Sequence, residues 1–160
     1  MLTESEVVKA VCGFLENNGF QVRQALCETE RGVDILAISL NGQRQVSIEA
    51  KGETSSKPST NRYGKASFNG GQVLDHVSKA LYCAARDCSS SLAGIALPKA
   101  ARKVRKRILP ALRTLQIEVF WVLPDSKVET KHIWNFWDCA NSHAASQSVG
   151  PGDGKSARRN

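Results

Sequence analysis

The stretch GVDILAISLNGQRQVSIEAKG, from Gly32 to Gly52, decides the fold because its pattern is that of two strands joined by a tight turn. Two largely apolar runs flank Asn41-Gly42, and this dipeptide between two such runs is the strongest short-range signal of a β-hairpin. We therefore expect antiparallel strands over residues 33–40 and 45–51.

The pairing of these strands predicts where three charged residues lie. A two-residue turn at Asn41-Gly42 places Asp34 opposite Glu49. Opposed side chains of an antiparallel pair share one face, with Cβ atoms about 4.5–5.5 Å apart, and Lys51 two residues further on points to the same side. The opposite face is expected to pack in the core, and it contains Val33, Ile35, Ala37, Val46, Ile48 and Ala50.

Two carboxylates held this close repel each other unless a cation lies between them. A hard divalent ion such as Mg²⁺ resolves the conflict, because it takes carboxylate, water and phosphate oxygens as ligands. Lys51 beside such an ion can hold or deprotonate the attacking water, or neutralise charge that grows on phosphorus. Asp34, Glu49 and Lys51 therefore predict phosphodiester hydrolysis, and the alternative is a surface salt-bridge cluster on an edge hairpin.

The rest of the chain predicts helices and strands in the order α-β-β-β-α-β-α-β. Thr3 and Glu6 form a capping box that begins the first helix, and Asn18-Gly19 ends it. The expected elements are a helix over 3–18, strands over 20–27, 33–40 and 45–51, a helix over 72–87, a strand over 92–98, a basic helical stretch over 99–116 that Pro110 kinks or splits, and a strand over 117–123. This order predicts an α/β fold, with a central mixed sheet flanked by helices on both faces.

The segments GVDI and IEAKG resemble the metal site of the PD-(D/E)XK nuclease superfamily, in which an Asp on one strand is followed by Glu/Asp-x-Lys on the next. Val33 stands where that motif has proline, as in branches related to Mrr-like restriction enzymes and archaeal Holliday-junction resolvases. The resemblance covers about Thr3 to Leu123 and implies a restriction-endonuclease-like αβββαβ core.

The same resemblance implies an endonuclease that hydrolyses DNA with Mg²⁺ or Mn²⁺. Asp34, Glu49 and the carbonyl of Ala50 would bind the ion, and Lys51 would activate water. The alternative is a catalytically silent nuclease-fold module that binds nucleic acid or a partner, which the intact Asp-Glu-Lys set argues against. Charge and motif do not exclude RNA as the substrate.

Two further residues match positions that act in related enzymes. Glu6 lies on the first helix, where related enzymes often have a Glu that reaches the metal through water, with Glu4 as the second choice. Gln72 begins the helix after a long loop, where several branches place a Gln near the metal or the scissile phosphate. The structural alternatives are a capping role for Glu6 with Thr3, and local hydrogen bonds for Gln72. For His76, one turn later, a solvated or packed histidine is the expectation.

Basic residues are expected to bind the nucleic-acid backbone. The formal net charge of +7 favours a polyanionic partner. The basic stretch over 99–116 contains no acidic residue, which favours phosphate contact over an ordinary solvated face. The polar loop over 53–71 carries further positive charges. The residues expected to contact nucleic acid are Lys57, Arg62, Lys65, Arg102, Lys103, Arg105 and Lys106.

The composition is that of a soluble globular protein, with 160 residues, 41% hydrophobic and 23% charged. No apolar run is long enough to span a bilayer, and the start MLTESEVVKA lacks the apolar region of a signal peptide. The five scattered cysteines favour reduced thiols in a cytoplasmic protein. The spacing of Cys83, Cys88, Cys139 and His143 is poor for a zinc site, so none is expected.

We expect one nuclease-like domain over residues 1–140 and a disordered polar and basic tail over 141–160. The segment KHIWNFWDCA, residues 131–140, is expected to pack as a terminal helix. A lone catalytic domain often dimerises to cut both strands, so a homodimer is one expected arrangement, although the sequence carries no interface signature.

Overall fold

The computed structural model of the chain describes residues 1–26, 30–54, 68–87, 91–99 and 102–130, with the backbone alone for 102–107. The helices are α1 (Glu4–Asn17), α2 (Gly70–Asp87) and α3 (Arg102–Thr114). The strands are β1 (Phe20–Ala25), β2 (Ile35–Ser39), β3 (Gln45–Ala50), β4 (Leu92–Pro98), β5 (Glu118–Val122) and β6 (Val128–Glu129). The predicted terminal helix over 131–140 and the predicted tail over 141–160 lie outside the described residues. No helix within the described ranges is both long and apolar enough to cross a membrane.

The strands form one mixed sheet in the order β1-β2-β3-β4-β5-β6. The first three strands pair antiparallel, β4 pairs parallel with both β3 and β5, and β6 pairs antiparallel with β5. The element order follows the prediction as far as β5, so the α/β class and the mixed sheet are confirmed. The prediction lacks β6, because a strand of two residues leaves no periodicity in the sequence.

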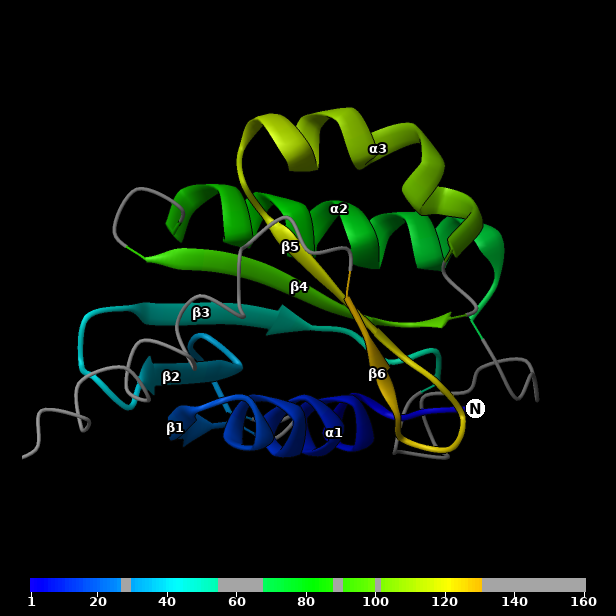
Figure 1. Cartoon of the computed structure of the whole chain (residues 1–160). Coiled ribbons are helices and arrows are strands. Elements are labelled where there is room, and N and C mark those ends of the chain that lie inside the picture. Colours follow the sequence, from blue (N-terminus) through cyan, green and yellow to red (C-terminus); the bar gives the residue numbers. More distant parts are fainter. Residues whose placement is uncertain (27–29, 55–67, 88–90, 100–101, 131–160) are drawn as a thin grey trace, which may run out of the picture.

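Helices cover both faces of the sheet, as predicted, with α1 on one side and α2 and α3 on the other (Figure 1). Each face has its own apolar core. Alternate residues of β4 serve the two cores: Ala96 packs with α1, and Ile95 and Leu97 pack with α2. The hairpin residues that pack against α1 are Ile35, Ala37, Val46, Ile48 and Ala50. The other face of the hairpin, which carries Glu49, therefore lies on the α2 side.

The helix α1 begins and ends where the sequence predicts. The backbone N–H of Thr3 donates to Glu6 Oε2 at 2.7 Å, and the N–H of Glu6 donates to Thr3 Oγ1 at 3.3 Å. This capping box satisfies two of the donors that a first helical turn leaves without partners. Asn18 caps the other end, and Gly19, with a φ of +81°, lets the chain reverse into β1.

The hairpin of β2 and β3 has the predicted register but a longer loop. Leu36 pairs with Ser47, as the count from the sequence requires. The predicted two-residue turn is wrong, because the last bond of the ladder runs from the N–H of Ser39 to the carbonyl of Arg44 at 2.8 Å, which leaves a loop over 40–43. Since this longer loop has the same centre as the predicted turn, the pairing and the faces of both strands are unchanged.

The basic helix α3 runs from Arg102 to Thr114 with Pro110 inside it. Of the two expected outcomes, a kink or a split, the split is wrong, because one helix continues through Pro110. Pro110 removes one backbone donor, and Leu112, just after it, is fully buried in the core shared with α2. Most of the basic residues of α3 lie in its N-terminal half.

Candidate active site

Four charged side chains meet at the end of the hairpin that lies away from its loop. Three come from the hairpin and the residue after it, and one comes from α1. We call them the Lys51 cluster: Glu4, Asp34, Glu49 and Lys51. Lys51 Nζ lies 2.8 Å from Glu49 Oε1, 3.5 Å from Asp34 Oδ2 and 3.3 Å from Glu4 Oε2. It also donates a hydrogen bond to the carbonyl of Ala50. The three residues that the strand register predicts to converge thus meet around one ammonium group.

Asp34 is held in place by both strands of the hairpin. It lies directly before β2 and is only 9% exposed. Its Oδ2 accepts a hydrogen bond of 2.7 Å from the N–H of Ala50, at the end of β3. Its backbone carbonyl accepts a further bond of 2.8 Å from the N–H of Leu26. The carboxylate oxygen that faces Lys51 is therefore positioned by backbone as well as by charge.

Burial and charge act in opposite directions on this cluster. Burial raises the pKa of the Glu49 carboxyl above its ordinary value, although the hydrogen bond and the charge of Lys51 work against this. For Lys51 itself, burial favours a lower pKa, but the hydrogen bond to Glu49 and the charges of Asp34 and Glu4 outweigh it, so that the pKa is raised. Lys51 is therefore an ammonium at neutral pH.

Glu4 reaches the cluster because the N-terminal residues pack against the chain that follows β3. The N–H of Glu53 donates to the carbonyl of Leu2 at 2.9 Å, and the N–H of Leu2 donates to Glu53 Oε1 at 2.8 Å. Between these contacts Gly52 approaches α1 so closely that a Cβ there would lie 2.6 Å from the Glu4 nitrogen. Only glycine allows this approach, which places Glu4 next to Lys51.

Glu6, which the sequence suggests as the assisting acid, does not belong to the Lys51 cluster. Its carboxylate accepts hydrogen bonds from the backbone N–H and the hydroxyl of Thr3, at 2.7 and 2.9 Å. These bonds hold the pKa of the exposed Glu6 carboxyl below its ordinary value. The acid of α1 that contacts Lys51 is Glu4. The capping-box pattern of the sequence is the signal that the Glu6 carboxylate is already hydrogen-bonded to Thr3.

Gln72 likewise makes its contacts at a helix start. Gln72 Oε1 accepts a hydrogen bond of 2.9 Å from the N–H of Asn69, and the N–H of Gln72 donates to Asn69 Oδ1 at 3.0 Å. This reciprocal pair is a second capping box, at the start of α2. Across the described part of the chain, no hydrogen bond or ion pair joins Gln72 to the Lys51 cluster, so the structure places this side chain in the local role.

His76 packs on the site's side of α2 rather than within the cluster. Its ring meets Phe68 edge-on, with ring centroids 4.5 Å apart. Burial lowers the pKa of His76, and the positive charges of Lys51 and Lys79 lower it further, so the imidazole is neutral at neutral pH. Its Nδ1 is buried and has no hydrogen-bond partner among the described residues. The expectation of a packed histidine is met.

The oxygens of the Lys51 cluster fit a hard divalent cation in chemical type. Asp34, Glu49 and the carbonyl of Ala50 each bring one oxygen to the same ammonium, and Mg²⁺ is commonly held by one or two carboxylates with water and phosphate completing its shell. In the described ranges, no three His, Cys, Asp or Glu side chains form a group ready to hold a metal. An ion here would therefore depend on ligands from water or substrate.

The structure describes the side chain of none of the seven residues predicted to bind nucleic acid. Lys57, Arg62 and Lys65 lie outside the described residues. The basic residues of α3 are described by their backbone alone, and they are Arg102, Lys103, Arg105 and Lys106. Of the residues weighed for zinc, Cys88, Cys139 and His143 lie outside the described ranges as well.

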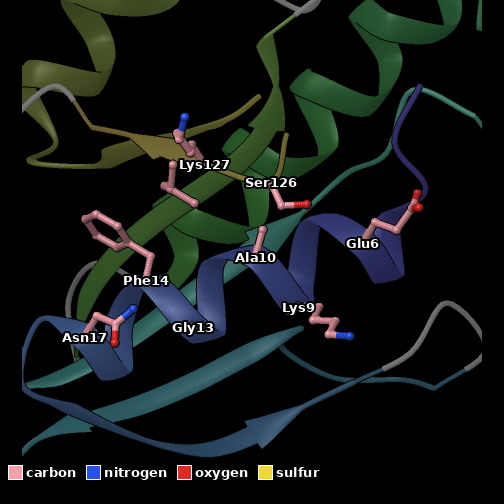
Figure 2. Close-up of a pocket in the computed structure, with 9 residues that line it drawn as sticks. Glu6, Lys9, Ala10, Gly13, Phe14, Asn17, Ser126 and Lys127 are labelled. Carbon is pink, nitrogen blue, oxygen red and sulfur yellow. The ribbon is translucent and has the colours of Figure 1, made fainter. Parts of the chain in front are cut away.

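A separate pocket of about 570 Å³ lies along α1, beside the turn between β5 and β6 (Figure 2). Glu6 stands at one end of it and Phe14 towards the other, while the ammonium groups of Lys9 and Lys127 point away from each other. The lining residues are Glu6, Lys9, Ala10, Gly13, Phe14, Asn17, Ser126, Lys127 and Val128. No member of the Lys51 cluster lines this pocket.

The geometry of the Lys51 cluster is the basis on which a function can be assigned. No protein-family model matches the chain, and no curated protein or solved structure matches it.

Proposed function

We propose that this protein is a metal-dependent endonuclease that hydrolyses DNA phosphodiester bonds with Mg²⁺ or Mn²⁺, on a sheet of the restriction-endonuclease type. The observation that carries the proposal is the convergence of Asp34, Glu49 and the Ala50 carbonyl on one cationic atom in a partly buried site. Carboxylates placed this close repel each other unless a cation lies between them. A metal-dependent phosphodiesterase binds its catalytic ion between such carboxylates. The resemblance of GVDI and IEAKG to the nuclease motif supports the same reading.

The order of the elements also supports a nuclease core. The helix α1, the three antiparallel strands, the crossover helix α2 and the parallel strand β4 follow in the sequence expected for an αβββαβ core. The candidate site lies where β2 begins and β3 ends, at the end of the hairpin away from its loop. A metal site in such enzymes requires this juxtaposition.

The roles of the residues follow from their contacts. Asp34, Glu49 and the Ala50 carbonyl would hold the ion, which supplies Lewis-acid stabilisation of the phosphate and an activated water when bound. Lys51 contributes a positive charge beside the phosphate. Its raised pKa favours this role over the deprotonation of water, because an ammonium has no free electron pair with which to accept a proton.

Cleavage of plasmid DNA tests the proposal. We expect the protein to nick or cut supercoiled DNA with Mg²⁺ or Mn²⁺ and to be inactive with EDTA. Lys51→Ala and Asp34→Asn should each abolish cleavage, while DNA binding survives. The matched controls are Lys127→Ala and Asp125→Asn, which remove an exposed ion pair of 2.9 Å that is not part of the Lys51 cluster and should leave cleavage unchanged. Full cutting by Lys51→Ala would contradict the assigned roles.

One observation favours a second candidate, a catalytically silent module of the same fold. The ammonium of Lys51 already pairs with both carboxylates that would hold the ion, so part of their charge is compensated without any metal. Calorimetric titration with Mn²⁺ separates the two. If the protein is a nuclease, the wild type should bind Mn²⁺ and the Glu49→Gln variant should not. Equal titration curves for the wild type and the variant would favour the module.

A further inference from the structure

The solvent side of α2 carries an exposed aromatic ring beside two cations. We call Lys79, Tyr82 and Arg86 the α2 outer face. Tyr82 is 71% exposed, the Arg86 side chain is 58% exposed, and Lys79 is exposed as well. Residues three and four positions apart on a helix are neighbours, so both basic residues lie next to the ring. The core of α2 is made by its other side, which leaves this ring without a structural task in the core.

The α2 outer face borders the Lys51 cluster. Ser47, two residues before Glu49 on the same face of β3, donates a hydrogen bond to Asp87, which in turn pairs with Arg86. Burial lowers the pKa of His76, and the charges of Lys51 and Lys79 act on it in the same direction. An α-helix turns by about 100° per residue, so both basic residues of the face lie, around the helix axis, between Tyr82 and the side that meets the cluster.

Two acidic residues of α2, Asp75 and Asp87, lie near the cations of this face, and both cations stay exposed. Arg86 Nε lies 2.7 Å from Asp87 Oδ1, and the Ser47 hydroxyl donates to Asp87 Oδ2 at 3.1 Å. Asp87 thereby anchors the guanidinium next to β3 while the Arg86 side chain stays more than half exposed. Asp75 lies one helical turn before Lys79 and two turns, about 10 Å along the axis, before Tyr82. The Tyr82 ring therefore lies between an exposed ammonium and an exposed guanidinium that binds Asp87 through two of its nitrogens.

We propose that the α2 outer face binds an unpaired stretch of DNA next to the cleavage site, with one base stacked on Tyr82 and the adjoining phosphates on Lys79 and Arg86. The proposal rests on the proposed function for the identity of the Lys51 cluster as the cleavage site. Aromatic rings beside a positive track bind single strands because every base has a face on which it can stack. In a duplex those faces are covered by neighbouring base pairs, so the ring selects unpaired over paired DNA.

The test measures binding of labelled single-stranded and duplex DNA of equal length by fluorescence anisotropy, with EDTA present so that nothing is cleaved. We expect Tyr82→Ala to weaken single-strand binding about tenfold and to leave duplex binding within about twofold. Tyr82→Phe keeps the ring and should bind as the parent does. Leu40→Ala is the matched control, because Leu40 is also 71% exposed but lies in the hairpin loop, and it should change neither affinity.

A charge variant tests the phosphate contacts separately. Lys79→Gln should weaken binding of both DNA forms, and it should reduce the dependence of single-strand affinity on salt by about 0.7 of a logarithmic unit per logarithmic unit of salt. Tyr82→Ala should leave that slope unchanged, because stacking releases no counterions. An unchanged slope in Lys79→Gln would remove this residue from the proposed surface.

The outcomes also distinguish this inference from the proposed function. Unchanged single-strand affinity in Tyr82→Ala, or an equal loss for both DNA forms, would overturn the stacking surface. A protein that cuts DNA with Mg²⁺ and shows either result keeps the nuclease assignment and loses this surface. A protein that binds single strands through Tyr82 and never cuts keeps the surface and loses the nuclease assignment.

Discussion

The starts of α1 and α2 use the same local chemistry and have different consequences. Each start is closed by a capping box, Thr3 with Glu6 in α1 and Asn69 with Gln72 in α2. The α2 box has only local partners among the described residues. The α1 box lies against the chain after β3 and delivers Glu4 to Lys51.

In each helix the capping box occupies the side chain of the third helical residue. At both helix starts the side chain three residues into the helix is held by the cap residue, so it is not available to a site across the sheet. The carboxylate of Glu4, the first residue of α1, extends to the ammonium of Lys51 at 3.3 Å. The helix start that joins the candidate site does so through its first residue.

The largest expected effect comes from removing the group to which the α1 start binds. Lys51→Ala leaves three carboxylates of low exposure without their shared cation, and we expect it to lower the free energy of unfolding by about 3 kcal/mol in urea denaturation. Added Mn²⁺ should restore part of this loss, since a divalent ion can replace the ammonium. Lys127→Ala, with a side chain 79% exposed, should change stability by less than about 1 kcal/mol.

The next largest effect is expected from a substitution that pushes the start of α1 away from the end of β3. Gly52→Ala places a methyl group 2.6 Å from the Glu4 nitrogen, and we expect a loss of about 1–3 kcal/mol in unfolding free energy together with weaker Mn²⁺ binding. Gly13→Ala is the control, because a methyl group there meets no atom within 4 Å. As a half-buried site within a helix with room for the methyl group, it should gain about 0.5–1 kcal/mol. Equal behaviour of the two variants would mean that α1 is not docked through Gly52.

Removing each cap should give similar losses of stability and different effects on the site. Thr3→Ala and Asn69→Ala should each cost about 1 kcal/mol in urea denaturation. Only Thr3→Ala should also weaken Mn²⁺ binding, because only the α1 start holds a residue of the Lys51 cluster. A loss of Mn²⁺ affinity in Asn69→Ala would erase the distinction between the two starts.

The Thr3 cap has a pH dependence whose sign follows from the Glu6 carboxyl. Its pKa is lowered in the folded protein from the ordinary value of 4.5, so the stability that it contributes is present above that pH. This contribution should disappear as the pH falls through the lower, folded value. Urea denaturation of wild type and Thr3→Ala between neutral and acidic pH checks this, and a difference that grows on acidification contradicts it.

The smallest effect is the pairwise coupling that separates Glu4 from Glu6. A double-mutant cycle of Glu4→Gln with Lys51→Met should give a coupling of about 0.5–1 kcal/mol. The matched cycle of Glu6→Gln with Lys51→Met should give none within error. Equal couplings would return Glu6 to the site.

The register of the hairpin could be predicted from the pattern of its residues, whereas the shape of its loop could not. Its register follows from the alternation of apolar residues and from the position of Asn41-Gly42, because a slip of one residue would turn the buried face outwards. The shape of its loop does not follow, since residues beyond the dipeptide also form the contacts that set it. The N–H of Leu40 donates to the carbonyl of Gly19 at 2.9 Å, and Ser39 Oγ donates to Asn41 Oδ1 at 2.6 Å.

The order of the elements as far as β5, the pairing of β2 with β3 and hence the meeting of Asp34, Glu49 and Lys51 could be predicted from the amino-acid pattern, because they depend on local periodicity and on the strict alternation of strand side chains. Which acid of α1 completes the cluster depends on contacts between distant parts of the chain. That choice depends on the close approach at Gly52 and on a hydrogen bond between residues 51 positions apart. No local pattern encodes a contact of that range.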